Sequence, residues 1–229
     1  MDAIAREGDA SANAGYLALV RSQRARLLVA DLDGRVVAFG GVVEIDGVSM
    51  LTDLFVAADA RGAGIGTRLL VELFDGSSRR MTFSSKDPSA LAAYQRAGMA
   101  PQWRLLYLRG VANGGGIGLP AATWQHDRLS LVERMVTMGA HVTSDVVATP
   151  DETGIWIARL QTTRPVKALS ATLAGMTPGT VVNMCVPAYS PLAPWALRSG
   201  FAEVDFDRFC ATPDVALPPD LHCLDPGLA

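Results

Sequence analysis

Cysteine, histidine and aromatic residues are scarce in this chain. Only three cysteines and three histidines occur among 229 residues, and aromatic residues make up 7%. The cysteines, Cys185, Cys210 and Cys223, lie far apart in no spacing typical of a metal site, so we expect no metal and at least one free thiol. We predict that Cys185 and Cys210 are buried strand residues in a reducing, cytoplasmic setting.

A strong positive charge and long apolar runs are lacking as well. The formal net charge is −3, so we expect no nucleic-acid partner. Residues 1–24 carry acidic side chains and no long apolar run, which predicts no signal peptide. No stretch reaches the ~18 consecutive apolar residues of a membrane span, so we expect no membrane partner either.

Apolar residues are plentiful, at 49% of the chain, which is enough for a packed core. The turn signals Asp33-Gly34 and Asp46-Gly47 separate β-rich runs, because both positions of such a turn tolerate positive φ. They predict a meander of three antiparallel strands, which we place at residues 27–32, 35–43 and 48–56. Further on, the pattern predicts a helix at 67–74, a strand at 81–83, a helix at 89–97 closed by Gly98, and a strand at 105–108. The predicted fold class is mixed α+β, with a central twisted, mainly antiparallel sheet flanked by helices.

The second half repeats this order of elements in outline. Residues 113–120 are rich in glycine and predict a linker between a domain at 1–112 and a second one at 121–229. Outside the linker, we predict helices at 11–24, 123–138, 166–173 and 192–198, strands at 141–148, 155–160, 181–186 and 202–210, a turn at 149–154, and an irregular tail from Pro213. Aligning Gly98-Met99 with Gly200-Phe201 supports a duplication.

A loop with three glycines follows the third predicted strand. It consists of Arg61, Gly62, Ala63, Gly64, Ile65, Gly66 and Thr67 and leads into a helix. Glycine lets backbone N–H groups approach a ligand closely, and a helix start adds about half a positive charge. The sequence therefore predicts an anion site suited to a pyrophosphate. It is not a P-loop, because no lysine follows Gly66, and its alternating glycines differ from G-x-G-x-x-G.

This loop, with the preceding Leu54, Phe55 and Val56, resembles the signature of the GNAT superfamily of acetyl-CoA-dependent N-acetyltransferases. That signature is a strand ending near Leu-Tyr/Phe-Val, then Arg/Gln-x-x-Gly-x-Gly/Ala, then a helix. A second match lies downstream, where this chain has Asp87, Ala90, Tyr94, Gly98 and Met99. Asp87 stands in place of the usual asparagine and Met99 in place of the usual phenylalanine. The resemblance covers residues 27–109.

The resemblance implies that acetyl-CoA is a co-substrate. The amides from Gly62 to Thr67 would hold its pyrophosphate, and Phe55 and Val56 would pair with its pantetheine arm like an added strand. Asp87 would contact the same arm, but as an acceptor of hydrogen bonds where asparagine could also donate.

Tyr94 is the predicted general acid, which protonates the departing thiolate; the alternative is a tyrosine packed in its helix. Asp53 is the candidate general base or else a structural carboxylate. Many relatives place a glutamate where this chain has Met50 or Thr52, and Glu44 is a looser candidate.

The predicted function is transfer of an acetyl group to a primary amine, either a small molecule or a peptide. The alternatives are a GNAT-fold module that binds acyl-CoA without turnover, as a sensor or partner subunit, and a dimer scaffold that binds none. A homodimer is compatible with each. The second half has no glycine around Arg164, Pro165 removes an N–H there, and Ala196 falls opposite Tyr94. We therefore predict that it has no cofactor loop and no acid.

Overall fold

The computed structural model describes residues 25–114, 140–143 and 145–226. They form two compact units, one made of the residues up to Gln102 with Arg208–Ala216, the other of Trp103–Asp207 with the residues from Leu217 onward. The predicted helices at 11–24 and 123–138, and most of the predicted linker, lie outside the described residues. In the described part of the chain, no helix is long and apolar enough to cross a membrane.

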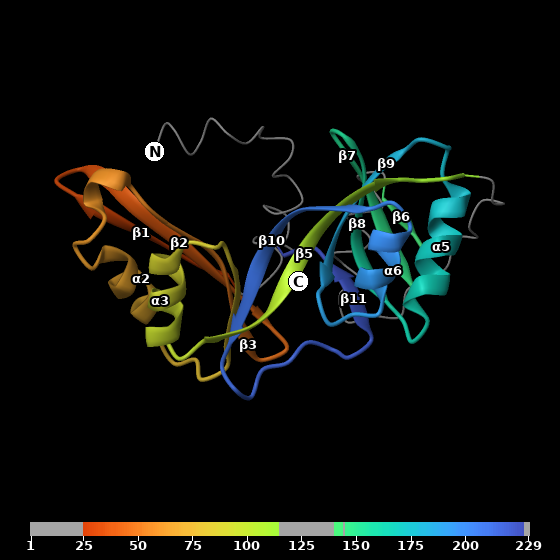
Figure 1. The fold of residues 1–229 in the computed structure, drawn as a ribbon. Helices are drawn as coiled ribbons and strands as arrows, with labels where there is room; N and C mark the ends of the chain where they lie inside the picture. Colours follow the sequence, from red (N-terminus) through yellow and green to blue (C-terminus); the bar gives the residue numbers. More distant parts are fainter. Residues whose placement is uncertain (1–24, 115–139, 144, 227–229) are drawn as a thin grey trace. The chain divides into compact units, whose positions relative to one another are not determined.

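The first unit begins with the predicted meander, which is confirmed (Figure 1). Its strands are β1 (Ala25–Leu32), β2 (Arg35–Ile45) and β3 (Val48–Val56), paired antiparallel. Asp33 and Gly34 have φ of 54° and 82°, and Asp46 and Gly47 have φ of 49° and 73°. Both turns thus have positive φ at two consecutive positions, as a type I′ hairpin turn requires.

The rest of the first unit follows the predicted order. It contains the short 3₁₀-helix η1 (Ala58–Ala60), α2 (Ile65–Leu73), β4 (Arg80–Ser84) and α3 (Pro88–Arg96). β4 pairs parallel with β3 and antiparallel with β10 (Ala202–Ala211), so the order of strands is β1-β2-β3-β4-β10. β5 (Ala100–Val111) and β10 contribute residues to both units.

Helices α2 and α3 share one core with the strands. The predicted apolar stripe of α2 is buried, with Leu69, Leu70, Leu73 and Phe74 each at most 5% exposed. They pack with Tyr94 and with residues of β2 and β3. Gly40 allows this close packing, because a Cβ there would lie 2.7 Å from Leu73 Cδ1.

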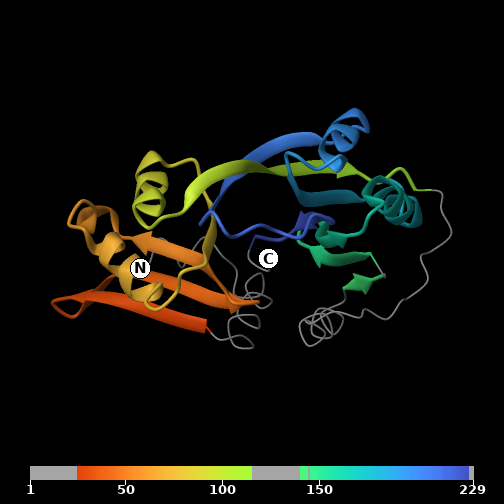
Figure 2. The ribbon, with the colours of Figure 1, turned by 90° about the horizontal axis from the view of Figure 1, so that it is seen from below.

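The second unit has the same succession of elements (Figure 2). It contains β5, β6 (His141–Val142), β7 (Val146–Asp151), β8 (Gly154–Gln161), α5 (Pro165–Gly175), β9 (Val181–Pro187), α6 (Leu192–Arg198), part of β10, and β11 (Leu221–Leu224). The order of strands is β10-β5-β9-β8-β7-β6, and β11 pairs with β8. Mainly antiparallel strands with flanking helices confirm the predicted fold class, whereas the duplication stays a prediction.

Two predictions for this unit are wrong. The single strand predicted at 141–148 is two short antiparallel strands, β6 and β7. The chain reverses there because the Thr143 hydroxyl accepts a hydrogen bond from the Val146 amide, at 3.0 Å. The turn predicted at 149–154 is shorter, since Pro150 pairs with Ile155 and Asp151 with Gly154 inside the hairpin. The tail predicted to be irregular contains β11, whose four residues are too few to show a periodicity.

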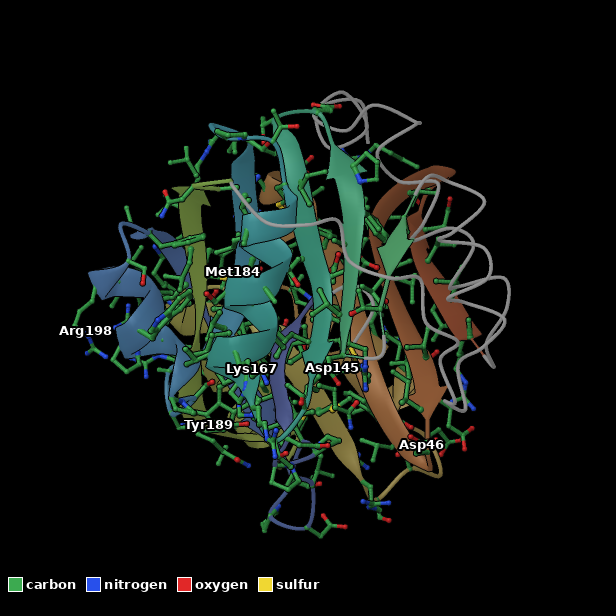
Figure 3. All side chains as sticks on the ribbon, turned by 90° about the vertical axis from the view of Figure 1, so that its right-hand side faces the viewer. Asp46, Asp145, Lys167, Met184, Tyr189 and Arg198 are labelled. Carbon is green, nitrogen blue, oxygen red and sulfur yellow. The ribbon has the colours of Figure 1, made fainter. Side chains whose placement is uncertain are left out.

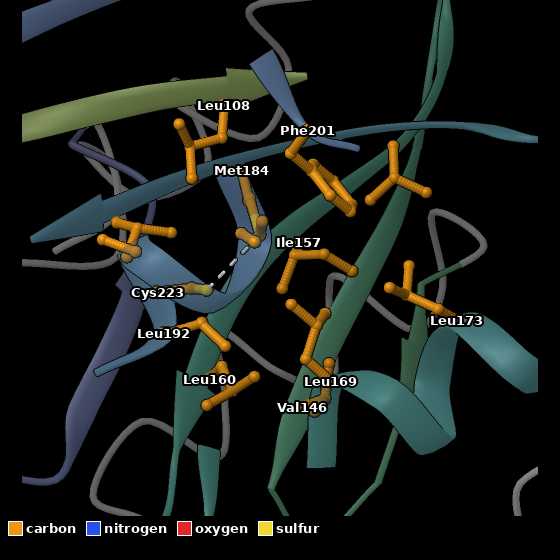
Figure 4. Close-up of a cluster of buried hydrophobic side chains, with 14 of the residues drawn as sticks. Leu108, Val146, Ile157, Leu160, Leu169, Leu173, Met184, Leu192, Phe201 and Cys223 are labelled. Atoms are coloured by element: carbon orange, nitrogen blue, oxygen red, sulfur yellow. Dashed lines mark hydrogen bonds between the residues drawn. The ribbon is translucent and has the colours of Figure 1, made fainter. Parts of the chain in front are cut away.

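The core of the second unit lies among β8, β9 and its two helices (Figure 4). Helix α5, which carries Lys167, lies in front of the strands in the view of Figure 3 and contacts β7 and β8. Cys223 on β11 and Met184 on β9 meet in this core, with their sulfur atoms 4.0 Å apart. Cys185 and Cys210 are both 0% exposed and lie in β9 and β10, which confirms the prediction for these two thiols.

Candidate functional site

A β-bulge in β3 shapes the candidate site. Gly41 pairs with Asp53 and Val42 pairs with Leu51, so Thr52 is an extra residue on β3. The Thr52 hydroxyl donates to the Gly41 carbonyl at 3.2 Å. A bulge bends its strand and increases the local twist, and so redirects the residues that follow it.

The pairing of β3 with β4 ends at this bulge. The last parallel pair joins Leu51 to Thr82, although β3 itself continues to Val56. The described strands give β3 only β2 and β4 as neighbours, so none of them pairs with the β4-facing edge of Leu54–Val56. That edge presents backbone N–H and C=O groups, to which an extended ligand can add like a strand.

The glycine loop follows directly on this edge. Gly62 and Gly64 have φ of 84° and 77°, in the left-handed region that favours glycine. A Cβ on either residue would meet no atom of the described residues within 4 Å. Gly64 is the N-cap of α2 and makes no side-chain hydrogen bond to it. The first N–H groups of α2 thus have no side-chain cap from Gly64 and carry the positive end of the helix dipole, as an anion site requires.

Arg61 links the loop to its surroundings. Its Nε donates to the Val56 carbonyl at 3.0 Å, which fixes the end of β3. The loop and the end of β3 are thus held together. Hydrogen bonds from Ser89 and Ala90 lower the pKa of Asp87, at the start of α3, more than the charge of Arg61 does.

Asp87 is the N-cap of α3. Its carboxylate accepts hydrogen bonds from the Ser89 amide at 2.7 Å and the Ala90 amide at 3.3 Å. Hydrogen bonds from Ser89, first from its hydroxyl and then from its amide, lower the pKa of Asp87. Aspartate is among the best N-cap residues, so capping explains why this position tolerates aspartate. Its contact with the cofactor stays a prediction.

Tyr94 belongs to the core of the first unit. Its side chain is 7% exposed, in the cluster to which Leu54, Val56 and Ile65 also pack. The structure therefore brings the predicted acid together with the end of β3 and the start of α2. Its role as an acid stays a prediction.

Asp53 lies on the other face of the sheet. A Cβ at Gly41 would lie 3.6 Å from Asp53 Oδ2 and 2.9 Å from Leu27 Cδ2, which puts these side chains on the face away from α2. On the same strand, the half-exposed Phe55 stacks on Phe39 with ring centroids 5.0 Å apart. A carboxylate beside an apolar surface can hold an ammonium group with an apolar body.

Sequence reasoning missed Gly40 and Gly41 as residues that shape the site, and it named Thr52 only as a position where relatives place a glutamate. The two consecutive glycines inside a β-rich run were the available signal, because glycine in a strand often marks a bulge or a close approach. No residue type marks Thr52 as the bulge.

Comparison with known protein families confirms the resemblance for part of the chain. Residues 23–98 match the model of the acetyltransferase (GNAT) domain. This segment contains the meander, the loop, α2 and α3. No curated protein matches the sequence.

Solved structures share the fold at low identity. An acetyltransferase of Pyrococcus horikoshii has 14% identity and a TM-score of 0.74, with 97% of this chain and 87% of the other covered. A GCN5-related N-acetyltransferase of Sphaerobacter thermophilus has 16% identity and a TM-score of 0.54, with 85% and 83% covered. A GCN5-related glucosamine N-acetyltransferase region of a fungal multi-domain protein has 15% identity and a TM-score of 0.59, with 86% of this chain and 34% of the other covered.

Proposed function

We propose, from the GNAT acetyltransferase domain at residues 23–98, that this chain transfers an acetyl group from acetyl-CoA to a primary amine. One observation carries the proposal: β3 continues past its pairing with β4 and leads into a glycine loop at an uncapped helix start. This arrangement offers an edge for an extended arm and, at the end of that edge, a site for phosphates.

The binding groups are mainly backbone groups. The amides from Gly62 to Thr67 would hold the pyrophosphate, and Leu54, Phe55 and Val56 would pair with the pantetheine arm. Ala63 and Ile65 lie within this loop, and Arg61 adds positive charge at its start. Because these groups are fixed by strand and helix, they need little reorganisation when the ligand binds.

The chemistry needs two proton transfers. The amine nitrogen attacks the thioester carbonyl carbon, the carbon–sulfur bond breaks, and the amine loses a proton. Asp53 would accept that proton, directly or through water, and Tyr94 would give its phenolic proton to the departing sulfur. A tyrosine of ordinary pKa about 10 is a suitable donor to a thiolate.

The acceptor is a primary amine on a small molecule or a peptide. The chain's net charge of −3 and the carboxylate of Asp53 favour a cationic amine. The low exposure of Tyr94, 7%, favours the second candidate, a module that binds acyl-CoA without turnover. Turnover with an amine panel separates these two functions.

Calorimetric titration with acetyl-CoA tests the proposal. Gly64→Glu should abolish binding, because it places a carboxylate and a bulky side chain where the phosphates would lie. Gly76→Glu is a matched control, since Gly76 also has a positive φ, 74°, with nothing within 4 Å of a Cβ, but lies after α2. Both substitutions carry the same backbone strain, so only the position relative to the loop differs.

We expect micromolar binding to the unmodified chain and to Gly76→Glu, and none to Gly64→Glu. Equal binding by all three proteins would place the cofactor elsewhere. No binding to any of them would reject acetyl-CoA as the co-substrate.

A further inference from the structure

The second unit contains a strand edge like that of β3. Val147 pairs with Arg159 and Ala148 with Ile157, so Ala158 is an extra residue on β8. The parallel pairing of β8 with β9 ends at Ile157. As in β3, the bulge follows directly on the last residue that pairs with the parallel neighbour.

The edge of β8 beyond this bulge is occupied by β11. Leu221 pairs with Gln161 and Leu224 with Arg159 in antiparallel register. The pairing is extended at both ends, since the Thr162 amide donates to Asp220 at 2.8 Å and the Asp225 amide to Ala158 at 2.9 Å. The C-terminal strand thus uses the bulge residue itself as an acceptor.

β11 fills the space between β8 and β9. Its four residues are between 0% and 6% exposed, so both of its faces are buried. Cys223 contacts Met184 of β9 while its backbone pairs with β8. His222 bonds through Nδ1 to the Ser190 hydroxyl at 2.8 Å, which ties β11 to the start of α6.

We propose that the second half holds a groove for an extended amide chain of the pantetheine type and that β11 fills it as a built-in ligand. This inference rests on the proposed function, because it transfers the role of the β3 edge to the edge of β8. A peptide strand and a pantetheine arm are both extended chains with amide donors and acceptors, so they would compete for one edge.

The junction after β8 explains why a peptide is the occupant. Only three residues separate β8 from α5, and Pro165 begins that helix without an N–H. The phosphates of CoA find no glycine loop there. Without an occupant, the edge of β8 would expose backbone groups that favour association with another chain.

The test uses the full chain with a protease site inserted after Ala216, in the exposed connection before β11. After cleavage, β11 is held only by non-covalent contacts. The probe is S-methylpantetheine, which lacks the nucleotide and has no free thiol. Release of the C-terminal fragment is measured by gel filtration with mass spectrometry, and alkylation of the buried Cys185 reports that the groove is open.

The uncleaved protein, in which β11 stays tethered, is the reference for binding of the probe to the β3 edge of the first unit. We expect millimolar S-methylpantetheine to raise the released fraction of the fragment at equilibrium about tenfold and to raise the alkylation of Cys185. Leu221→Asp in the fragment should cause release without the probe, whereas Ala216→Asp, at an exposed position, should not.

Unchanged release in the presence of the probe would overturn the proposal. If the fragment leaves on cleavage alone, the emptied protein should bind one more S-methylpantetheine per chain in a calorimeter than the uncleaved protein does, and equal binding would overturn the proposal. Acetyl-CoA binding by the cleaved protein is measured in parallel. It reports separately on folding and on the proposed function.

Discussion

The junction between β3 and α2 and the junction between β8 and α5 begin alike and end differently. Each strand has a bulge directly after its last parallel pair. The first junction then has eight residues, with left-handed Gly62 and Gly64, and the second has three, with Arg164 as N-cap before Pro165. The strand edge and the anion site are therefore separate structural features. Both junctions have the strand edge, but only the first also has the glycine loop.

The helices that close each half also match in their backbone and differ in their side chains. The Met99 amide donates to the Tyr94 carbonyl and the Phe201 amide to the Ala196 carbonyl, both at 3.0 Å. The glycine before each donor has positive φ, 82° at Gly98 and 92° at Gly200. This geometry agrees with the alignment predicted from the sequence. At this matched position the two halves differ in one side chain, a phenol in the first half and a methyl group in the second.

The largest expected effect comes from removing that phenol. Tyr94→Phe should lower kcat by about 10²–10⁴-fold, the range for loss of a general acid. The substitution removes only the hydroxyl group and keeps the packed ring. Acetyl-CoA affinity, measured by calorimetry, should stay within about twofold. The measurement is acetyl transfer to any amine found in the acceptor screen.

Tyr107→Phe is the control for this prediction. The Tyr107 hydroxyl bonds to Asp207 at 2.8 Å in the second unit, so its removal should leave kcat unchanged. Full activity of Tyr94→Phe would show that Tyr94 is not the general acid, so that the first half, like the second with Ala196, has no proton donor at this position.

An intermediate effect concerns the packing of α2. In the two halves, Gly40 of β2 and Val146 of β7 occupy matching positions. Each lies two residues before the residue that pairs with the end of the parallel pairing, which is Leu51 in β3 and Ile157 in β8. Gly40→Ala is the smallest step toward the valine of the second half. A Cβ there meets Leu73 at 2.7 Å and a backbone carbonyl at 3.2 Å, so we expect a loss of about 1–3 kcal/mol in the free energy of unfolding. Urea denaturation measures it.

Gly41→Ala should cost less than Gly40→Ala. Its Cβ meets the end of Leu27, which is 59% exposed and can move away, together with the Thr52 hydroxyl. If Gly41→Ala is the more damaging substitution, the bulge and not the packing of α2 sets the requirement for glycine in β2.

The smallest expected effect is a pH dependence that β11 brings to the second unit. Burial lowers the pKa of His222 below its ordinary value of 6.5, against the smaller raising influences of a backbone hydrogen bond with Thr162 and the charge of Asp220. As the pH falls below 6.5, His222 therefore binds a proton more readily in the unfolded chain than in the folded chain. The stabilisation from neutral His222 is thus present above that pH and is lost as the pH falls.

Unfolding by urea between about pH 5 and pH 7 measures this dependence. His222→Gln should show a flatter change of unfolding free energy with pH than the unmodified chain. Equal slopes for the two proteins would show that His222 titrates alike in both states and that its burial has no electrostatic consequence.

Local signals in the sequence predicted much of the fold. Asp33-Gly34 and Asp46-Gly47 specify their turns through backbone conformation alone, and the apolar stripe of α2 specifies which face is buried. β11 and the pairing of β4 with β10 gave no such signal. They depend on which distant segments meet, and the four residues of β11, in a proline-rich tail, are too few to show a periodicity.

The part of the candidate site that glycines and a helix start create was predictable from the sequence. The part that strand pairing creates was not. Gly62 and Gly64 are marked by their residue type, because left-handed φ is costly for other residues. The position at which β3 leaves β4 depends on an extra residue in the pairing, and threonine at position 52 is an ordinary strand residue. The residue types therefore predict the phosphate loop, whereas the strand edge at Phe55 and Val56 was expected only from the family resemblance, and the bulge that frees it was not predicted.

The pairing of β4 with β10 has a consequence for biosynthesis. Every residue proposed to bind acetyl-CoA lies before position 100, but Phe209 and Cys210, which pair with β4 in the finished sheet, lie more than 100 residues after their partners. A ribosome must therefore synthesise all the intervening residues before β4 can gain this neighbour. Closing so long a loop slows folding, so a nascent chain would expose one side of β4 until β10 emerges, in the state that chaperones recognise.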